Sequence, residues 1–223
     1  GAFGYTIGNI ATLLANLDVA KMRHRERVDS VDNFMKSKKL PQGLQERVHH
    51  YFNYLWDSRQ GYDDATILQE LPDSFKYEFA VELNQEVLEK VPMFKGADQN
   101  LLREIAICLV PCIFTPGDAI FSFGEVGDKM YFIRKGQVEV VSSDGKEVYA
   151  TLGEGDFFGE VALLLKQPRN ATIRSIGYCD LYSLNKESFD RVISYYTDFE
   201  KKIQQMARDR MHSTNKPEGL TLL

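Results

Sequence analysis

Short apolar runs alternate with glycines over residues 111–184, and this pattern restricts the fold more than any other feature of the sequence. Nine of the sixteen glycines fall in this interval, which is typical of short strands joined by tight turns. Asp144-Gly145 predicts a hairpin turn, because these residues tolerate positive φ, and Gly136 marks another tight turn. The clearest strands are expected over 119–123, 129–134, 137–141 and 147–152.

Helical patterns flank this interval on both sides. Apolar residues recur at helical spacing over 18–92, and breaks at Leu40-Pro41, Gly61 and Pro72 divide this stretch into several helices. In the first of them, Val28, Val31, Phe34 and Met35 form the apolar side. Later helices are expected over 64–70, 73–83, 100–109, 188–195 and from Asp198 onward. With 223 residues, the chain is long enough for two domains.

The charge of the chain argues against one class of partner. The net charge is −5, which argues against a surface that binds nucleic acid. The distribution is uneven, because residues 21–39 hold seven Lys or Arg against three acidic residues and so carry +4, leaving −9 elsewhere.

Cysteines and histidines argue against metal chemistry. The three cysteines lack zinc-type spacing. Cys108 and Cys112 could meet on one helix, although reduced, packed thiols are the favoured interpretation. No histidine falls between residues 51 and 211, so a metalloenzyme built on a β-roll is disfavoured. We therefore expect neither a metal site nor an enzyme.

Residues 157–174, called the cassette below, carry the clearest chemical signal. Gly159 has no Cβ and lets the backbone approach a ligand closely, and amides at the start of a helix form an anion site. Arg169 offers a planar guanidinium suited to a phosphate. A carboxylate such as that of Glu160 is unfavourable beside an anion site, unless it accepts hydrogen bonds from the hydroxyls of a sugar. The cassette therefore predicts a site for a sugar phosphate.

Read in full, the cassette is Phe158-Gly159-Glu160-Val161-Ala162-Leu163-Leu164, a four-residue spacer, and Arg169-Asn170-Ala171-Thr172. In this form it resembles the phosphate-binding cassette of cyclic-nucleotide-binding domains. The resemblance implies an α+β fold, in which a helical linker precedes an antiparallel β-roll (a double-stranded β-helix, jelly-roll-like) flanked by helices.

The same resemblance assigns roles to residues. Arg169 pairs with the cyclic phosphate, together with amides near Gly159 and Ala171, and Glu160 accepts the ribose 2′-hydroxyl. The final helix closes over the base as a lid. The full set of ligand-binding residues so implied is Leu152, Phe158, Gly159, Glu160, Val161, Ala162, Arg169, Asn170, Ala171, Met206 and Arg210, with Leu152 and Val161 at the base and Met206 and Arg210 on the lid.

The helices before the roll resemble the linker of cyclic-nucleotide-gated and hyperpolarisation-activated channels. The residues that carry this likeness are Val28–Met35, Leu40–Leu44, Val48–Asp57 and Leu71-Pro72. The resemblance implies a homotetramer assembled through residues 18–91, a binding domain over 92–212 and a flexible tail over 213–223. It also implies a pore domain in the same polypeptide.

Residues 1–17 contain no charged side chain. They resemble the end of an inner pore helix, although the stretch is shorter than the roughly 20 residues that span a bilayer. The basic run that follows favours a membrane helix with a cytoplasmic flank; a buried soluble helix is the alternative. The resemblance therefore implies a cell-membrane protein whose residues from about 18 onward are cytoplasmic.

The function so implied is ligand sensing and gating in a tetrameric cation channel, of the prokaryotic potassium type, with cAMP or cGMP as effector. Asn170 stands where channels responsive to cGMP usually have Thr, which favours cAMP. The alternative is a soluble cyclic-nucleotide-responsive regulator. A transcription regulator is expected to continue into a helix-turn-helix, and a kinase regulatory subunit to carry two cassettes, whereas we find one.

Overall fold

The structure is a computed structural model that describes residues 21–59 and 71–214. The chain divides into two compact units, Gly1–Leu71 and Pro72–Leu223. The predicted pore-helix end at residues 1–17, the predicted helix over 64–70 and tail residues 215–223 lie outside the described ranges. None of the helices within those ranges is long and apolar enough to cross a membrane.

The first unit contains a helix over 21–37 and α2 (Gln42–Arg59), both as predicted. The first helix ends where Lys39 adopts a left-handed φ of 53°. The two helices are antiparallel, since the ring of His24 lies 4.9 Å from that of Trp56, while His49 contacts Asp32 at 2.7 Å. Met35 is buried, whereas Phe34, which belongs to the same apolar pattern, is exposed.

The second unit begins with α4 (Asp73–Lys90), the short 3₁₀ helix η1 (Pro92–Phe94) and α5 (Gln99–Cys108). The Nδ2 of buried Asn84 donates to the carbonyl oxygen of Ala106 at 2.8 Å and ties α4 to α5. Asp98 caps α5 by accepting the amides of Asn100 and Leu101. α4 extends seven residues beyond the predicted end at residue 83.

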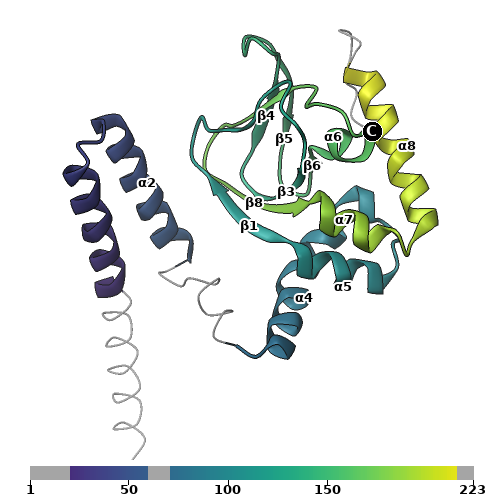
Figure 1. Ribbon diagram of the computed structural model, residues 1–223, viewed down its shortest axis with the longest axis horizontal. Helices are drawn as coiled ribbons and strands as arrows, with labels where there is room; N and C mark the ends of the chain where they lie inside the picture. The colour runs from purple at the N-terminus through teal and green to yellow at the C-terminus, as the bar shows by residue number, and fades with distance from the viewer. Residues whose placement is uncertain (1–20, 60–70, 215–223) are drawn as a thin grey trace, which may run out of the picture. The chain divides into compact units, whose positions relative to one another are not determined.

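The β-roll consists of two four-stranded antiparallel sheets, with strand orders β1-β8-β3-β6 and β2-β7-β4-β5 (Figure 1). Each sheet therefore pairs strands from the beginning and the end of the roll. The strands are β1 (Val110–Phe114), β2 (Ala119–Phe121), β3 (Lys129–Lys135), β4 (Val138–Val141), β5 (Val148–Leu152), β6 (Phe157–Phe158), β7 (Thr172–Ser175) and β8 (Cys179–Asn185). The predicted α+β fold with an antiparallel roll is confirmed.

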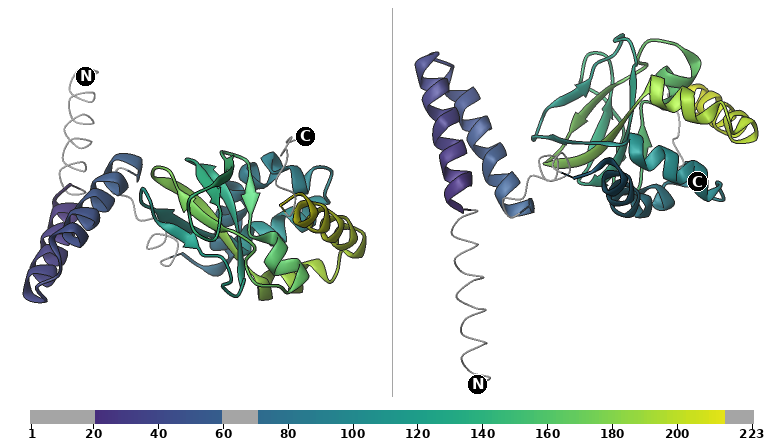
Figure 2. Two further views of the ribbon diagram at one scale, coloured as in Figure 1. Left: turned by 90° about the horizontal axis from the view of Figure 1, so that it is seen from above. Right: turned by 60° about the horizontal axis from the view of Figure 1, so that its bottom comes forward.

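The first sheet is buried on both faces. Along β3, Tyr131 and Ile133 point into the core between the sheets, whereas Met130 and Phe132 belong to a second core under the helices. This alternation is the two-residue period of a strand. The helices α4, α5, α7 (Lys186–Ile193) and α8 (Thr197–Thr214) accordingly gather on one side of the roll (Figures 1 and 2).

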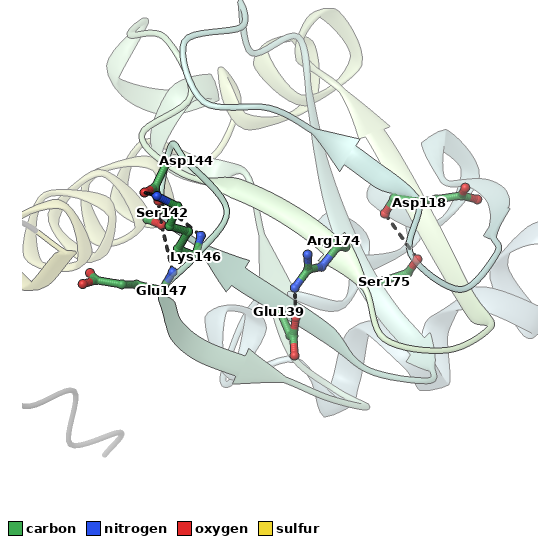
Figure 3. Close-up of polar contacts among 8 residues, drawn as sticks. All are labelled: Asp118, Glu139, Ser142, Asp144, Lys146, Glu147, Arg174 and Ser175. Atoms are coloured by element: carbon green, nitrogen blue, oxygen red, sulfur yellow. Dashed lines mark hydrogen bonds and ion pairs between the residues drawn. The ribbon is translucent and has the colours of Figure 1, made fainter.

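Local polar contacts close the turns of the second sheet (Figure 3). In the β4–β5 hairpin, Asp144 accepts from the Ser142 hydroxyl at 2.5 Å and from the Lys146 amide at 3.2 Å. These bonds lower the pKa of Asp144. Gly145 adopts a φ of +71°, which confirms the predicted hairpin turn. Across β7 and β4, Arg174 contacts Glu139 at 2.7 Å.

The cysteines do not share a helix. Cys108 is the last residue of α5, whereas Cys112 lies in β1. Pro111 ends any helical continuation between them, so the alternative in which these two residues meet on one helix is excluded. All three cysteines, including buried Cys179, are free thiols.

Candidate functional site

The cassette begins with a sharp turn from β6 into α6 (Glu160–Leu165). Gly159 is the N-cap of α6 and has a left-handed φ of 86°. A Cβ at Gly159 would lie 2.8 Å from the Nη1 atom of Arg169 and 3.2 Å from the carbonyl oxygen of Lys129. Glycine is therefore needed here both for the backbone conformation and for the close approach of Arg169.

Arg169 lies inside the turn, with only 3% of its surface exposed. Its Nη1 donates to the carbonyl oxygen of Gly159 at 2.8 Å, and its Nη2 to that of Lys129 at 2.6 Å. The guanidinium stacks over the ring of Phe121, with 3.9 Å from Cζ to the ring centroid. Arg169 thus binds one carbonyl at the N-terminal end of α6 and one in β3.

The charge of Arg169 is incompletely satisfied. Within the described ranges its hydrogen-bond partners are neutral carbonyls, and its buried Nε has no hydrogen-bond partner. Burial lowers the pKa of the guanidinium, although nearby acidic groups, among them Glu125 and Glu160, act in the opposite direction. A buried cation with an unused N–H group gains free energy when an anion comes within reach.

A loop between β2 and β3 supports Arg169 from the other side, which sequence reasoning missed. The Gly124 amide donates to the Arg169 carbonyl at 2.9 Å, and the Arg169 amide donates to the Glu125 carbonyl at 2.8 Å. A Cβ at Gly127 would collide with Ala162 and lie 3.2 Å from the guanidinium carbon of Arg169. The only sequence signal was the close spacing of Gly124 and Gly127.

Glu160 is the buried anion of the site. It is 3% exposed, and its Oε1 lies 2.8 Å from the Nη1 atom of Arg210 on α8. The same Nη1 donates to the carbonyl oxygen of Phe157 at 3.1 Å, and the guanidinium lies 4.0 Å over the Phe157 ring. The structure thus brings the predicted lid residue Arg210 onto the predicted ribose-binding carboxylate.

The remaining predicted residues occupy three kinds of position. Phe158, Val161, Ala162 and Ala171 are buried. Asn170 is exposed. Leu152 packs against the core between the sheets, and Met206 against the core under the helices.

The site offers charge and hydrogen bonds rather than metal ligands. Over residues 21–59 and 71–214, no three His, Cys, Asp or Glu side chains are grouped to hold a metal ion. What the site does combine is a buried guanidinium, a left-handed glycine before a helix and a buried carboxylate. This arrangement can hold an anionic ligand whose hydroxyl groups face Glu160.

The sequence defines the class of this domain. Residues 111–196 match the family described as "Cyclic nucleotide-binding domain". This part of the chain therefore belongs to the cyclic nucleotide-binding domains, which bind a ligand and are not catalytic.

Similarity to known proteins extends beyond that domain to nearly the whole chain. The human cyclic nucleotide-gated channel alpha-3 is 32% identical over 219 residues, which cover 96% of this chain and 32% of the relative. A cyclic nucleotide-gated cation channel of Ictalurus punctatus is 33% identical over 213 residues, which cover 93% of this chain and 31% of the relative. A cyclic nucleotide-gated channel of Caenorhabditis elegans is 32% identical over 219 residues, which cover 96% of this chain and 30% of the relative.

The chain thus spans about a third of the length of these relatives. The resemblance to the cyclic nucleotide-gated channel family, drawn above from the cassette and the linker, is confirmed.

Proposed function

We propose that this chain is the ligand-sensing and gating region of a tetrameric cyclic-nucleotide-gated cation channel. The observation that carries the proposal is the buried guanidinium of Arg169, beside the buried carboxylate of Glu160. The Nε of Arg169 has no hydrogen-bond partner among the residues that the structure describes. A cyclic nucleotide supplies one negative charge for the first group and one ribose hydroxyl for the second. The nucleotide is an effector, and it is released without chemical change.

In the bound state, Arg169 pairs with the cyclic phosphate, and amides near Gly159 and Ala171 complete the anion site. Glu160 accepts the ribose 2′-hydroxyl, which is the hydroxyl that a 3′,5′-cyclic phosphate leaves free. Leu152 and Val161 contact the base, as do Met206 and Arg210 from α8. The charge-assisted contact of Arg169 contributes about 1.5–3 kcal/mol to binding.

We infer that cAMP is the preferred effector, because the asparagine side chain of Asn170 does not place a hydroxyl where threonine would meet the guanine amino group. The exposure of Asn170 supports a contact with ligand. Potassium selectivity follows only from the resemblance to prokaryotic channels, and reversal potentials of the whole channel test it.

Exposed apolar side chains support assembly through residues 18–91. On α4, Phe75, Phe79 and Leu83 are 50%, 47% and 55% exposed and follow each other at intervals of four, so they share one face of the helix. Phe34 and Leu44 are also exposed in the first unit. Apolar surface of this kind is typical of protein–protein contacts, and a ring of four linkers would cover it.

Gating then follows from differential affinity. If the open pore is coupled to the arrangement of α8 that binds nucleotide better, binding shifts the pore toward opening. The linker connects the binding domain to a pore in the same polypeptide, in a cell membrane reached by the N-terminal segment. Residues from about 18 onward lie on the cytoplasmic side.

Calorimetric titration with cAMP and cGMP tests nucleotide binding. The Arg169→Ala variant is expected to lose about 10- to 150-fold in affinity for both nucleotides. Arg174→Ala is the matched control, because Arg174 lies five positions on and pairs with Glu139 on the second sheet. Equal losses in the two variants, or no binding to the folded wild-type chain, would refute the proposed site.

Light scattering of the same samples tests assembly separately. A mass near four chains supports the linker ring, and Phe79→Ser is expected to shift the mass toward smaller species. Tyr149→Ser, which changes an exposed aromatic residue on β5, is expected to leave the mass unchanged.

A further inference from the structure

Lys186 joins three elements at the point where β8 passes into α7. Its backbone amide donates to the carbonyl oxygen of Asp128 at 2.8 Å, just before β3. Its ammonium donates to the carbonyl oxygen of Leu163 in α6 at 3.0 Å and contacts the carboxylate of Asp190 in α7 at 2.9 Å. The cassette helix α6 and the helix α7 therefore share one cation.

The bond to Leu163 satisfies an acceptor that a short helix leaves open. α6 has six residues, so most of its carbonyls lack a partner within the helix. The Ala162 carbonyl receives the amides of Lys166 and Gln167, whereas the Leu163 carbonyl receives the ammonium of Lys186. A cation at this end of the helix is also favoured by the helix dipole.

Lys186 and Arg169 hold the same two segments from opposite ends. Arg169 bonds the carbonyl of Gly159 at the start of α6 and that of Lys129 in β3. Lys186 bonds the carbonyl of Leu163, near the end of α6, and that of Asp128, the neighbour of Lys129. Arg169 thus attaches the start of α6 to β3, and Lys186 attaches the end of α6 to α7.

From α7 the connection to α8 is short. The Ser194 amide donates to the Asp190 carbonyl at 3.1 Å, and the Tyr196 amide donates to the Ile193 carbonyl at 2.8 Å. These bonds fix the turn that leads into α8 at Thr197. α7 and α8 are therefore joined by a short turn that is held by backbone hydrogen bonds.

We propose that Lys186 is a positioning residue that transmits nucleotide binding from α6 to α7 and α8. This inference rests on the proposed function and names a side chain that connects the site to α7 and α8 in addition to the direct Glu160–Arg210 contact between α6 and α8. The contact pairs a charged donor with a backbone acceptor, so it persists when side chains of α6 are changed. Its loss is expected to separate ligand binding from the response of α8.

The test compares hydrogen exchange in wild type and Lys186→Met, each with and without saturating cAMP. Peptides from α6 report binding, and peptides from α8 report transmission. In wild type, cAMP is expected to slow exchange in both helices. In Lys186→Met, we expect α6 to remain protected, while the slowing in α8, about 5- to 150-fold for an ordinary coupling, falls to the part that the direct contacts of Met206 and Arg210 supply. Nucleotide affinity falls by the same coupling factor.

Three further variants keep the experiment decisive. Lys186→Arg retains a cationic donor and is expected to restore the α8 response. In Lys186→Gln the side chain is too short to reach both partners, so this variant replaces Lys186→Met if Lys186→Met does not fold. Lys146→Met makes the same chemical change in the β4–β5 hairpin, at a residue paired with Asp144, and is expected to behave as wild type.

Each outcome either supports or refutes the transmitting role of Lys186. An α8 response in Lys186→Met equal to that of wild type would overturn the role of Lys186, as would a wild-type chain that binds cAMP without any change in α8. A uniform loss of protection in every helix would assign Lys186 a structural role only. Absence of nucleotide binding by wild type would instead remove the proposed function itself.

Discussion

The guanidinium of Arg210 and the carboxylate of Glu160, 2.8 Å apart, join the last helix of the chain to the cassette. Glu160 is almost wholly buried and Arg210 is partly exposed. The pair holds α8 over α6 through the carboxylate that we assign to the ribose. Docking of the last helix and recognition of the sugar therefore depend on the same side chain.

Removing both members of this pair is expected to cost less stability than the two single removals added together. Arg210→Met leaves a buried carboxylate without its cation and is expected to destabilise the fold by about 1–3 kcal/mol. The double variant Arg210→Met with Glu160→Gln should lose less free energy of unfolding than the two single variants added together, because it leaves no buried charge without a partner. Urea unfolding without nucleotide measures these values, with Arg208→Met on the same helix as control. Additive losses would show that the two residues act independently.

Gly159→Ala separates backbone strain from the collision with Arg169. A left-handed alanine costs about 1–2 kcal/mol, and Gly145→Ala, at φ +71° with nothing within 4 Å of its Cβ, should show that cost alone. At Gly159 the new Cβ also meets Nη1 of Arg169. We therefore expect a larger loss in unfolding free energy, together with weaker cAMP binding by calorimetry. Equal effects at the two glycines would contradict this account.

Asn170→Thr tests the inferred nucleotide preference. The new hydroxyl is expected to hydrogen-bond the guanine amino group, a neutral contact of about 0.5–1.5 kcal/mol. The affinity ratio of cGMP to cAMP should then rise about 2- to 12-fold, measured by competition with a fluorescent nucleotide. The same substitution at Asn100, on α5, should leave the affinity ratio of cGMP to cAMP unchanged. A ratio that stays constant in Asn170→Thr would exclude this residue from base recognition.

Cys112 is expected to resist alkylation. Burial raises the pKa of its thiol from 9.0 to about 11, so at neutral pH the reactive thiolate is about 100-fold scarcer than in the unfolded chain. The folded state binds this proton more tightly, hence its contribution to stability is complete below pH 9 and is lost as the pH rises to about 11. Peptide mass spectrometry after iodoacetamide treatment, with and without urea, measures the difference. Similar rates in both conditions would refute the burial of this thiol.

Features with local causes were predictable from the sequence. The β4–β5 turn follows from the backbone preference of Gly145, and strands β2 to β5 follow from the alternation beside it. The start of the cassette helix follows from Gly159 in the same way.

Features with tertiary causes were not predictable. α4 continues to Lys90 because Leu88, at its C-terminal end, belongs to the core under the helices, and no local signal shows this. Gly127 is required by Ala162 and Arg169, which lie more than thirty positions away. The link from Lys186 to Leu163 likewise exists only once the roll has closed.

The pairing of β1 with β8 also decides when this domain can form during synthesis. Val110 and Ser183 are direct partners, although 73 positions separate them. Until β8 has left the ribosome, β1 has no neighbour, and the apolar faces of β3 remain open to solvent. Such distant pairings make folding slow, and an emerging chain with unpaired edges invites aggregation. The candidate site includes the carbonyl of Lys129 in β3, and β3 pairs with β8, so the assembly of this site also depends on the last strand.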